Sequence, residues 1–268
     1  MINQERIKNL LLELVRIDSV SRREREVAER VRAYCEELGA EVEIDDAGEK
    51  VGGNTGNVIA RFRGTIPDAE PIMMSAHMDT VVPGEGVKPV VEGDIIRSDG
   101  TTVLGGDDKS GIAVILETIR CLKEQNIPHT DIEAVFSICE EVGLLGAKHV
   151  DVSRLRSKYG LVFDSDDPGF LFTKGPSADH MEFKIHGLES HAGVAPESGI
   201  SAIRIAAEAI AGMKLGRIDE ETTANIGVIE GGKATNIVTN LVTVRGEARS
   251  LSDEKLEAQT LHMLKCFR

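Results

Sequence analysis

Two kinds of hydrophobic spacing alternate along the chain and predict its secondary structure. Apolar residues recur at intervals of three and four positions in five stretches, which predicts amphipathic helices at residues 3–16, 24–38, 109–125, 200–213 and 252–267. Compact or alternating apolar runs predict strands at residues 57–62, 71–76, 132–138, 160–163, 180–187, 222–229 and 237–249. Residues 81–108 are dense in Pro, Gly and Asp, which predicts a long loop.

The order of these elements predicts an α/β protein of two domains. Residues 1–176 alternate helices with apolar strands, as in a sheet domain flanked by helices. Residues 177–268 follow the order strand, helix, strand, strand, helix, which gives five of the six elements of an α+β ferredoxin-like unit and lacks its last strand. Arg268 follows a helical pattern directly, without a Gly stop or a polar tail. We therefore expect a chain that is truncated at its C-terminus.

Composition narrows the class of protein further. The 268 residues are 41% hydrophobic, enough to bury a substantial core, and carry a formal charge of −14 without a Lys/Arg cluster, so nucleic acid is not expected as a partner. Residues 1–17 are predicted to form a surface helix rather than a secretory signal, and no apolar run is long enough to span a bilayer, so no membrane partner is expected either. Four widely spaced cysteines favour reduced thiols in a cytoplasmic protein.

His77 and Asp79 form the first candidate for chemistry. They follow the apolar run PIMMSA, so an imidazole and a carboxylate leave the same side of an extended chain where a buried strand ends. A surface His beside a turn Asp would look the same. In a functional interpretation, His77 binds a metal ion and Asp79 orients its second ring nitrogen.

Three acidic groups follow at comparable positions. Asp107 lies beside Asp108 where a loop meets a helix; one Asp would suffice as an N-cap, so we predict that Asp107 bridges two cations while Asp108 faces elsewhere. Glu140 and Glu141 directly follow the apolar run IEAVFSIC, either as solvated strand-end acids or as a general base (Glu140) next to a metal ligand (Glu141). Asp164 ends the run GLVF, where an acidic turn is the alternative.

Taken together, these residues point to a metal site. His77, Glu141 and Asp164 end three apolar strands and Asp107 opens a helix, so all four side chains are expected to meet at one sheet edge. Carboxylates with one imidazole suit zinc, manganese or cobalt. A pair of such ions would support metal-assisted hydrolysis.

Six runs of residues also resemble one family, in order and in spacing. They are SAHMDTVVPG, SDGTTVLGGDDKSGIA, ICEEVGLLGAK, FDSD, SHAGVAPESGISAI and GGKATNIV. The runs resemble the zinc amidohydrolase family that contains peptidase T, carboxypeptidase G and succinyl-diaminopimelate desuccinylase, and look most similar to the peptidase T branch, which removes the N-terminal residue of short peptides. The resemblance implies two Zn²⁺ ions: His77 and Asp164 bind one, Glu141 binds the other, Asp107 bridges both, and Glu140 is the general base.

The resemblance also assigns roles in the second domain, which in relatives is a lid. His191 matches a residue that reaches the partner subunit's active site in dimeric relatives, and Asn236 and Arg249 match lid residues that hold substrate, so a homodimer through the lid is implied. Complete relatives take a final His ligand from a segment that returns to the catalytic domain, and no residue here matches it. The leading hypothesis is an aminopeptidase for tripeptides; the alternatives are an N-acyl amino acid amidohydrolase and an inactive metal-binding fragment.

Overall fold

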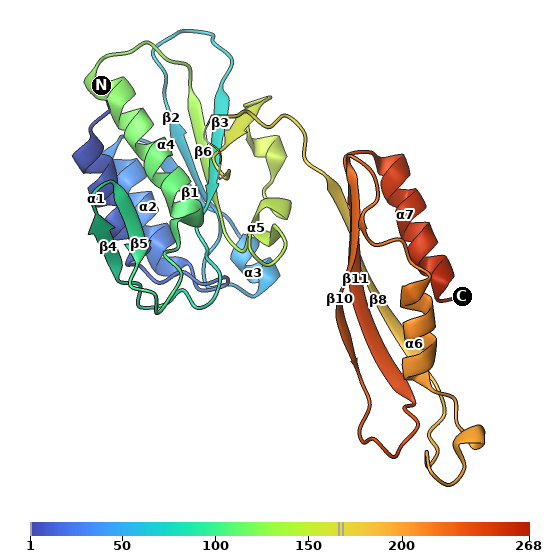
Figure 1. Cartoon of the computed structure of the whole chain (residues 1–268). Helices are drawn as coiled ribbons and strands as arrows, with labels where there is room; N and C mark the ends of the chain where they lie inside the picture. The colour runs from blue at the N-terminus through green and yellow to red at the C-terminus, as the bar shows by residue number, and fades with distance from the viewer. Residues whose placement is uncertain (1, 166, 168) are drawn as a thin grey trace. The chain divides into compact units, whose positions relative to one another are not determined.

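The chain divides into two compact units, Met1–Asp167 and Pro168–Arg268. The computed structural model describes residues 2–165, 167 and 169–268 of them (Figure 1). Each unit has its own sheet and its own hydrophobic core. The division lies shortly before the boundary at residue 176 that the sequence pattern suggests.

The first unit is built on a five-stranded mixed sheet. In spatial order its strands are β1 (Glu41–Ile44), β2 (Val58–Phe62), β6 (Ile132–Ser137), β3 (Ile72–His77) and β7 (Gly160–Val162). Strand β3 runs parallel to both β6 and β7, whereas β2 is antiparallel to β6 and to β1. The carboxyl ends of β3, β6 and β7 therefore lie at one edge of the sheet, as the sequence predicted for the three acid- or His-terminated runs.

Helices pack against this sheet and share its hydrophobic core. They are α1 (Gln4–Val15), α2 (Arg25–Glu37), α3 (Ala47–Val51), α4 (Gly106–Glu124) and α5 (Leu145–Lys148), with a short 3₁₀ turn at Val152–Arg154. Helix α4 contacts β3 and α1, while α2 contacts β1 and β2 (Figure 1). Ile112, Ile115 and Ile119 of α4 are completely buried, each contributing about 1.5–3 kcal/mol of apolar transfer free energy. Their spacing places them on one helix face, so the helix predicted from the periodicity is confirmed.

The Gly- and Pro-rich segment between β3 and α4 is not entirely loop. It contains a two-stranded hairpin of β4 (Pro89–Glu92) and β5 (Ile95–Ser98), joined by a tight turn in which Gly93 has φ +61°. The loop prediction was wrong at this point. A two-residue Gly-Asp connection between short apolar runs is a hairpin signal, and the surrounding Pro and Gly residues concealed it.

The second unit is a four-stranded antiparallel sheet covered by two helices. Its strand order is β8 (Ser177–His186), β11 (Leu241–Ser250), β10 (Thr222–Gly231) and β9 (Gly216–Arg217). Helices α6 (Ala202–Ala211) and α7 (Asp253–Cys266) both lie on one face (Figure 1), and a 3₁₀ turn spans Pro196–Ser198. Phe267 stacks on Phe183 with ring centroids 4.1 Å apart, which fastens the end of α7 to β8.

Two further sequence expectations concern cysteines and membranes. All four cysteines lie in the described part of the chain and none forms a disulfide; Cys35, Cys121 and Cys139 are buried. Among the described residues, none of the helices combines the length and the apolar character that crossing a bilayer would require.

Candidate metal centre

Five residues with ligand side chains come together at the carboxyl edge of the first unit's sheet. His77 is the last residue of β3, Glu140 and Glu141 follow β6, Asp164 follows β7, and Asp107 lies in the first turn of α4. Ligand atoms of His77, Asp107 and Asp164 all lie within 4.8 Å of one another, and so do those of His77, Glu140 and Glu141. The edge therefore carries two overlapping groups of possible ligands that share one imidazole.

The ring of His77 is held in one orientation. Its Nδ1 lies 2.9 Å from the backbone carbonyl oxygen of Asp79, so the tautomer with a proton on Nδ1 donates there. This leaves Nε2 facing the acids, 3.1 Å from Oδ1 of Asp107 and 3.9 Å from Oε2 of Glu140. An unprotonated Nε2 in this position is suited to bind a cation.

Asp79 supports more than the imidazole. Its carboxylate lies 3.4 Å from Nδ1 of His77, but its shorter contacts are with other groups. The carboxylate is completely buried and accepts hydrogen bonds from Ser21 Oγ at 2.6 Å, from the Glu140 amide at 2.8 Å and from the Glu141 amide at 3.2 Å. Asp79 thus connects His77 with the backbone of the two glutamates.

Asp107 and Asp108 differ sharply in exposure. The Asp107 side chain is 74% exposed and faces His77, whereas Asp108 is buried and accepts the amides of His77 at 3.2 Å and Gly111 at 3.0 Å. Asp108 thereby joins the end of β3 to the first turn of α4. Gly111 is required for this approach, because a Cβ there would lie 2.3 Å from Oδ1 of Asp108 and 2.6 Å from the carbonyl oxygen of Phe163.

The electrostatics of this edge favour a cation. Burial first, and repulsion between neighbouring carboxylates second, raise the pKa values of Glu140, Glu141 and Asp164. Burial alone would lower the pKa of His77, but the surrounding carboxylates, Asp79 foremost, raise it to about 10. A bound cation would offset the repulsion among these carboxylates. Divalent cations that accept oxygen and imidazole ligands, such as Zn²⁺, Mn²⁺ and Co²⁺, fit this set of side chains.

The second unit holds the other three residues that the sequence singled out. His191 and Asn236 are both exposed and lie close together, since Ala192 donates its amide to the Asn236 carbonyl oxygen at 2.9 Å and His191 pairs with Ile237. Arg249 lies near the opposite end of β11. It is roughly 27 Å from Leu241, at the near end, because the strand rises about 3.4 Å per residue. Its guanidinium makes two hydrogen bonds to Glu247, at 2.9 and 3.0 Å. Within this unit, His191 and Asn236 form one group and Arg249 lies apart from it.

Sequence reasoning missed the residues whose hydrogen bonds hold the candidate ligands in place. Ser21 reaches Asp79, and the completely buried Glu24 accepts the amide of Cys139, directly before Glu140. The only local signal was the S-x-x-E spacing of Ser21 and Glu24, which is equally a helix-start pattern. Local pattern alone therefore assigns these side chains to the start of α2 and not to a site more than fifty residues away.

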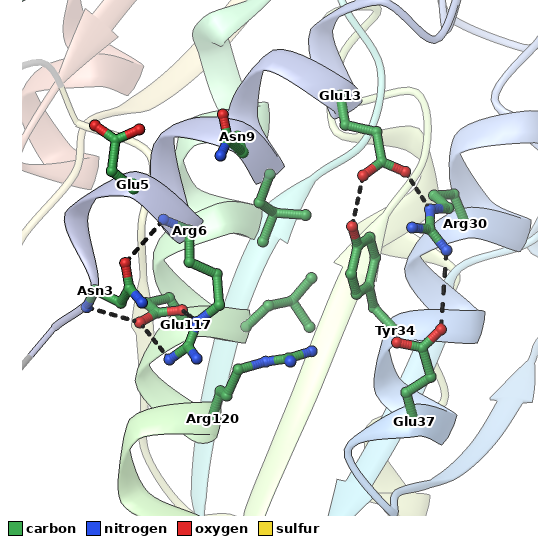
Figure 2. A pocket seen from close by; sticks show the side chains of 12 residues that line it. Asn3, Glu5, Arg6, Asn9, Glu13, Arg30, Tyr34, Glu37, Glu117 and Arg120 are labelled. Carbon is green, nitrogen blue, oxygen red and sulfur yellow. Dashed lines mark hydrogen bonds and ion pairs between the residues drawn. The ribbon is translucent and has the colours of Figure 1, made fainter. Parts of the chain in front are cut away.

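A separate hollow of about 530 Å³ lies between α1, α2 and α4 (Figure 2). Its charged side chains are largely paired: Arg6 bonds Glu117 at 2.7 Å, and Arg30 and Tyr34 both bond Glu13. Figure 2 shows these pairs as two separate groups on either side of the hollow. None of the five candidate ligands lines this hollow.

Comparison with known proteins is consistent with this geometry. The chain matches peptidase family M28 over residues 57–185 and a peptidase dimerisation domain over residues 176–265. It is 47% identical to protein YqjE of Bacillus subtilis over 268 residues, which is 100% of this chain and 72% of that protein.

Two solved structures share the fold along the whole chain. Aminopeptidase PepT of Bacillus cereus has a TM-score of 0.92 and 48% identity, and a tripeptidase of Staphylococcus aureus has a TM-score of 0.96 and 42% identity. In both cases the match covers 100% of this chain and 72% of the other.

A sheet edge that gathers a histidine and several carboxylates, in a chain that also carries a peptidase dimerisation domain, defines a metallopeptidase. Within that class, the chain belongs to the peptidase T-like family of metallo-aminopeptidases.

Proposed function

We propose that this protein hydrolyses the N-terminal peptide bond of short peptides, with tripeptides as the main substrates, at a site that binds two Zn²⁺ ions. The observation that carries the proposal is the cluster of His77, Asp107, Glu140, Glu141 and Asp164 at one sheet edge. The names of the two solved relatives, an aminopeptidase and a tripeptidase, support the substrate class. Mn²⁺ or Co²⁺ would suit the same ligands.

The proposed ligand roles divide the cluster into two sets. His77 and Asp164 would hold one ion and Glu141 the other, with Asp107 as a ligand shared by both. The proximity of His77, Asp107 and Asp164 supports the first set. When bound, the ions would supply the Lewis acidity that amide hydrolysis needs. The bridging role suits the exposed Asp107, since its buried neighbour Asp108 already accepts two backbone amides.

The proton transfers are proposed for Glu140. Its carboxylate lies beside the ligands, 3.9 Å from Nε2 of His77, and burial raises its pKa, which favours proton uptake by a general base. Glu140 would take a proton from the attacking water and deliver it to the leaving amine. Asp79 would keep Nε2 of His77 directed at the site by holding the ring through Nδ1.

In the second unit, His191 and Asn236 are proposed to contact substrate, with His191 acting on the active site of a partner subunit in a homodimer formed through this unit. The match to a peptidase dimerisation domain supports such an assembly. Arg249 is proposed to bind a peptide carboxylate, in which case the guanidinium would exchange its present partner Glu247 for the substrate.

The direct test is cleavage of a tripeptide by the purified protein with added Zn²⁺, Mn²⁺ or Co²⁺. We expect release of the N-terminal residue, and Glu140→Gln is expected to lower kcat by about 100- to 10,000-fold, which is the usual contribution of general acid–base catalysis. Full activity of Glu140→Gln would refute the mechanism. Preference for N-acylated amino acids over free-amine peptides would favour an amidohydrolase, and cation binding without turnover on either would favour a binding role.

A further inference from the structure

The segment that carries Glu140 and Glu141 is held by its backbone amides. Three consecutive residues, Cys139, Glu140 and Glu141, each donate their amide to a completely buried carboxylate: the first to Glu24 and the next two to Asp79. The preceding residue, Ile138, donates its amide to the buried Asn57 side chain at 3.0 Å. The route of the chain out of β6 is therefore set by side chains from three other parts of the first unit.

Cys139 is the residue at which this route turns. Its φ is +53°, in the left-handed region that residues with a side chain rarely adopt. Such a conformation persists only where surrounding contacts hold it. Both hydrogen-bond donors of Cys139 contact one atom, since its amide and its thiol donate to Oε1 of Glu24 at 3.1 and 3.4 Å.

Glu24 is placed for this contact by the turn that begins α2. The same Oε1 also accepts the amide of Arg22 at 2.9 Å, and the backbone carbonyl of Glu24 accepts the amide of Ala28 in the first turn of the helix. Oε2 is buried and has no hydrogen-bond partner among the described residues, which suits a carboxyl whose pKa is raised by burial. The side chain thus acts as an acceptor through one oxygen.

We propose that Glu24 is a positioning residue of the cation site: by binding the amide and thiol of Cys139, it fixes the direction in which Glu140 and Glu141 leave β6. Ser21, three residues earlier in the same turn, supports the other half of the arrangement by donating to Asp79. The turn before α2 therefore determines where the two glutamates lie, by hydrogen bonds to their segment and not by contact with substrate. The effect on turnover rests on the proposed peptidase function; the effect on the backbone does not.

The test replaces Glu24 by residues that keep or remove the acceptor. Glu24→Met fills the space without an acceptor, Glu24→Asp retains a carboxyl that is one methylene too short, and Glu24→Gln keeps Oε1. Glu117→Met is the matched control, because Glu117 is equally buried but bonds Arg6 and not the β6 segment. Amide hydrogen exchange of residues 138–142 in the cation-free protein is measured first, followed by Co²⁺ affinity and tripeptide kinetics.

We expect amide exchange in residues 138–142 to accelerate about tenfold or more in Glu24→Met and Glu24→Asp, because this segment would open locally. Co²⁺ affinity and kcat should each fall roughly 10- to 100-fold, as is usual for misplaced site groups, while KM changes little. Glu24→Gln should keep most of the Co²⁺ affinity and of kcat. Glu117→Met should lower the melting temperature only.

Two results would overturn the proposal. One is an unchanged rate of amide exchange in residues 138–142 of whichever variant folds, Glu24→Met or Glu24→Asp. The other is a loss of Co²⁺ affinity and kcat in Glu24→Gln that is as large as in Glu24→Met. If the wild-type protein cleaves no tripeptide with any of the three cations, the peptidase proposal fails by itself. Exchange and Co²⁺ affinity then still decide the role of Glu24.

Discussion

Asp79→Asn is the substitution that most directly tests how the site is assembled. The carboxylate has no exposure, and its two oxygens accept from Ser21 and from the amides of Glu140 and Glu141. Its Oδ1 also lies 3.4 Å from Nδ1 of His77. Asn has the same shape but only one oxygen. Whichever way its amide is turned, an N–H₂ group faces the backbone N–H of Glu140 or of Glu141.

The magnitude follows from that mismatch. A buried donor left without an acceptor costs about 1–3 kcal/mol, and each 1.36 kcal/mol corresponds to about a tenfold change in an equilibrium or rate constant. We therefore expect Asp79→Asn to lower cation affinity and kcat roughly 10- to 100-fold, the range found for residues that support metal ligands. These losses of cation affinity and kcat should be larger than those caused by removing one negative charge far from the site.

Competition with a metallochromic chelator measures the cation affinity, and tripeptide hydrolysis at saturating cation measures kcat. Asp151→Asn provides the control, because the Asp151 side chain is exposed and accepts from Ser153, away from the site, and the substitution removes the same charge. Wild-type affinity and wild-type kcat in Asp79→Asn would refute the reasoning. Equal losses in the two variants would do the same, since net charge alone would then explain the result.

Two further predictions concern the stability of the first unit. Arg6 lowers the pKa of the buried Glu117, although burial alone would raise it, so the pair stabilises the fold above the unfolded carboxyl pKa of about 4.3 and ceases to do so as pH falls through the lower folded value. Thermal melting between pH 2 and 7 should show a shallower acid dependence for Glu117→Gln than for wild type, and identical slopes would contradict this. Gly111→Ala should destabilise the protein by about 2 kcal/mol or more in urea unfolding, because its Cβ would overlap the Asp108 carboxylate. Gly53→Ala, whose added Cβ would meet only ordinary contacts from 3.5 Å outward, should stay within about 1 kcal/mol of wild type, and equal effects at the two positions would contradict the overlap.

The sequence predicted the fold best where periodicity was long and uninterrupted. The buried isoleucines of α4 and the compact apolar run of β6 each specified one element without ambiguity. His77, Glu141 and Asp164 were expected at one sheet edge because they end three apolar runs, and the strands of these runs, β3, β6 and β7, prove to be parallel. The β4–β5 hairpin was missed because four-residue strands among Pro and Gly residues give little periodic signal.

The supporting residues of the site could not be predicted for a different reason. Glu24 and Ser21 act on residues that lie 115 and 58 positions away in the sequence, and their spacing is also that of an ordinary helix start. Asp108 likewise lies where the sequence allows an ordinary acid at a helix start, but its carboxylate also fixes the end of β3 by accepting the His77 amide. A contact of this kind depends on where three strands meet, which periodicity does not encode.

All five candidate ligands and all of their buried supports belong to the first unit, whereas His191, Asn236 and Arg249 belong to the second. The proposed function thereby assigns cation binding and substrate contact to separate units of the chain. Under this proposal, substitutions in the second unit are expected to change the preferred peptide while the candidate ligands at the sheet edge of the first unit are retained.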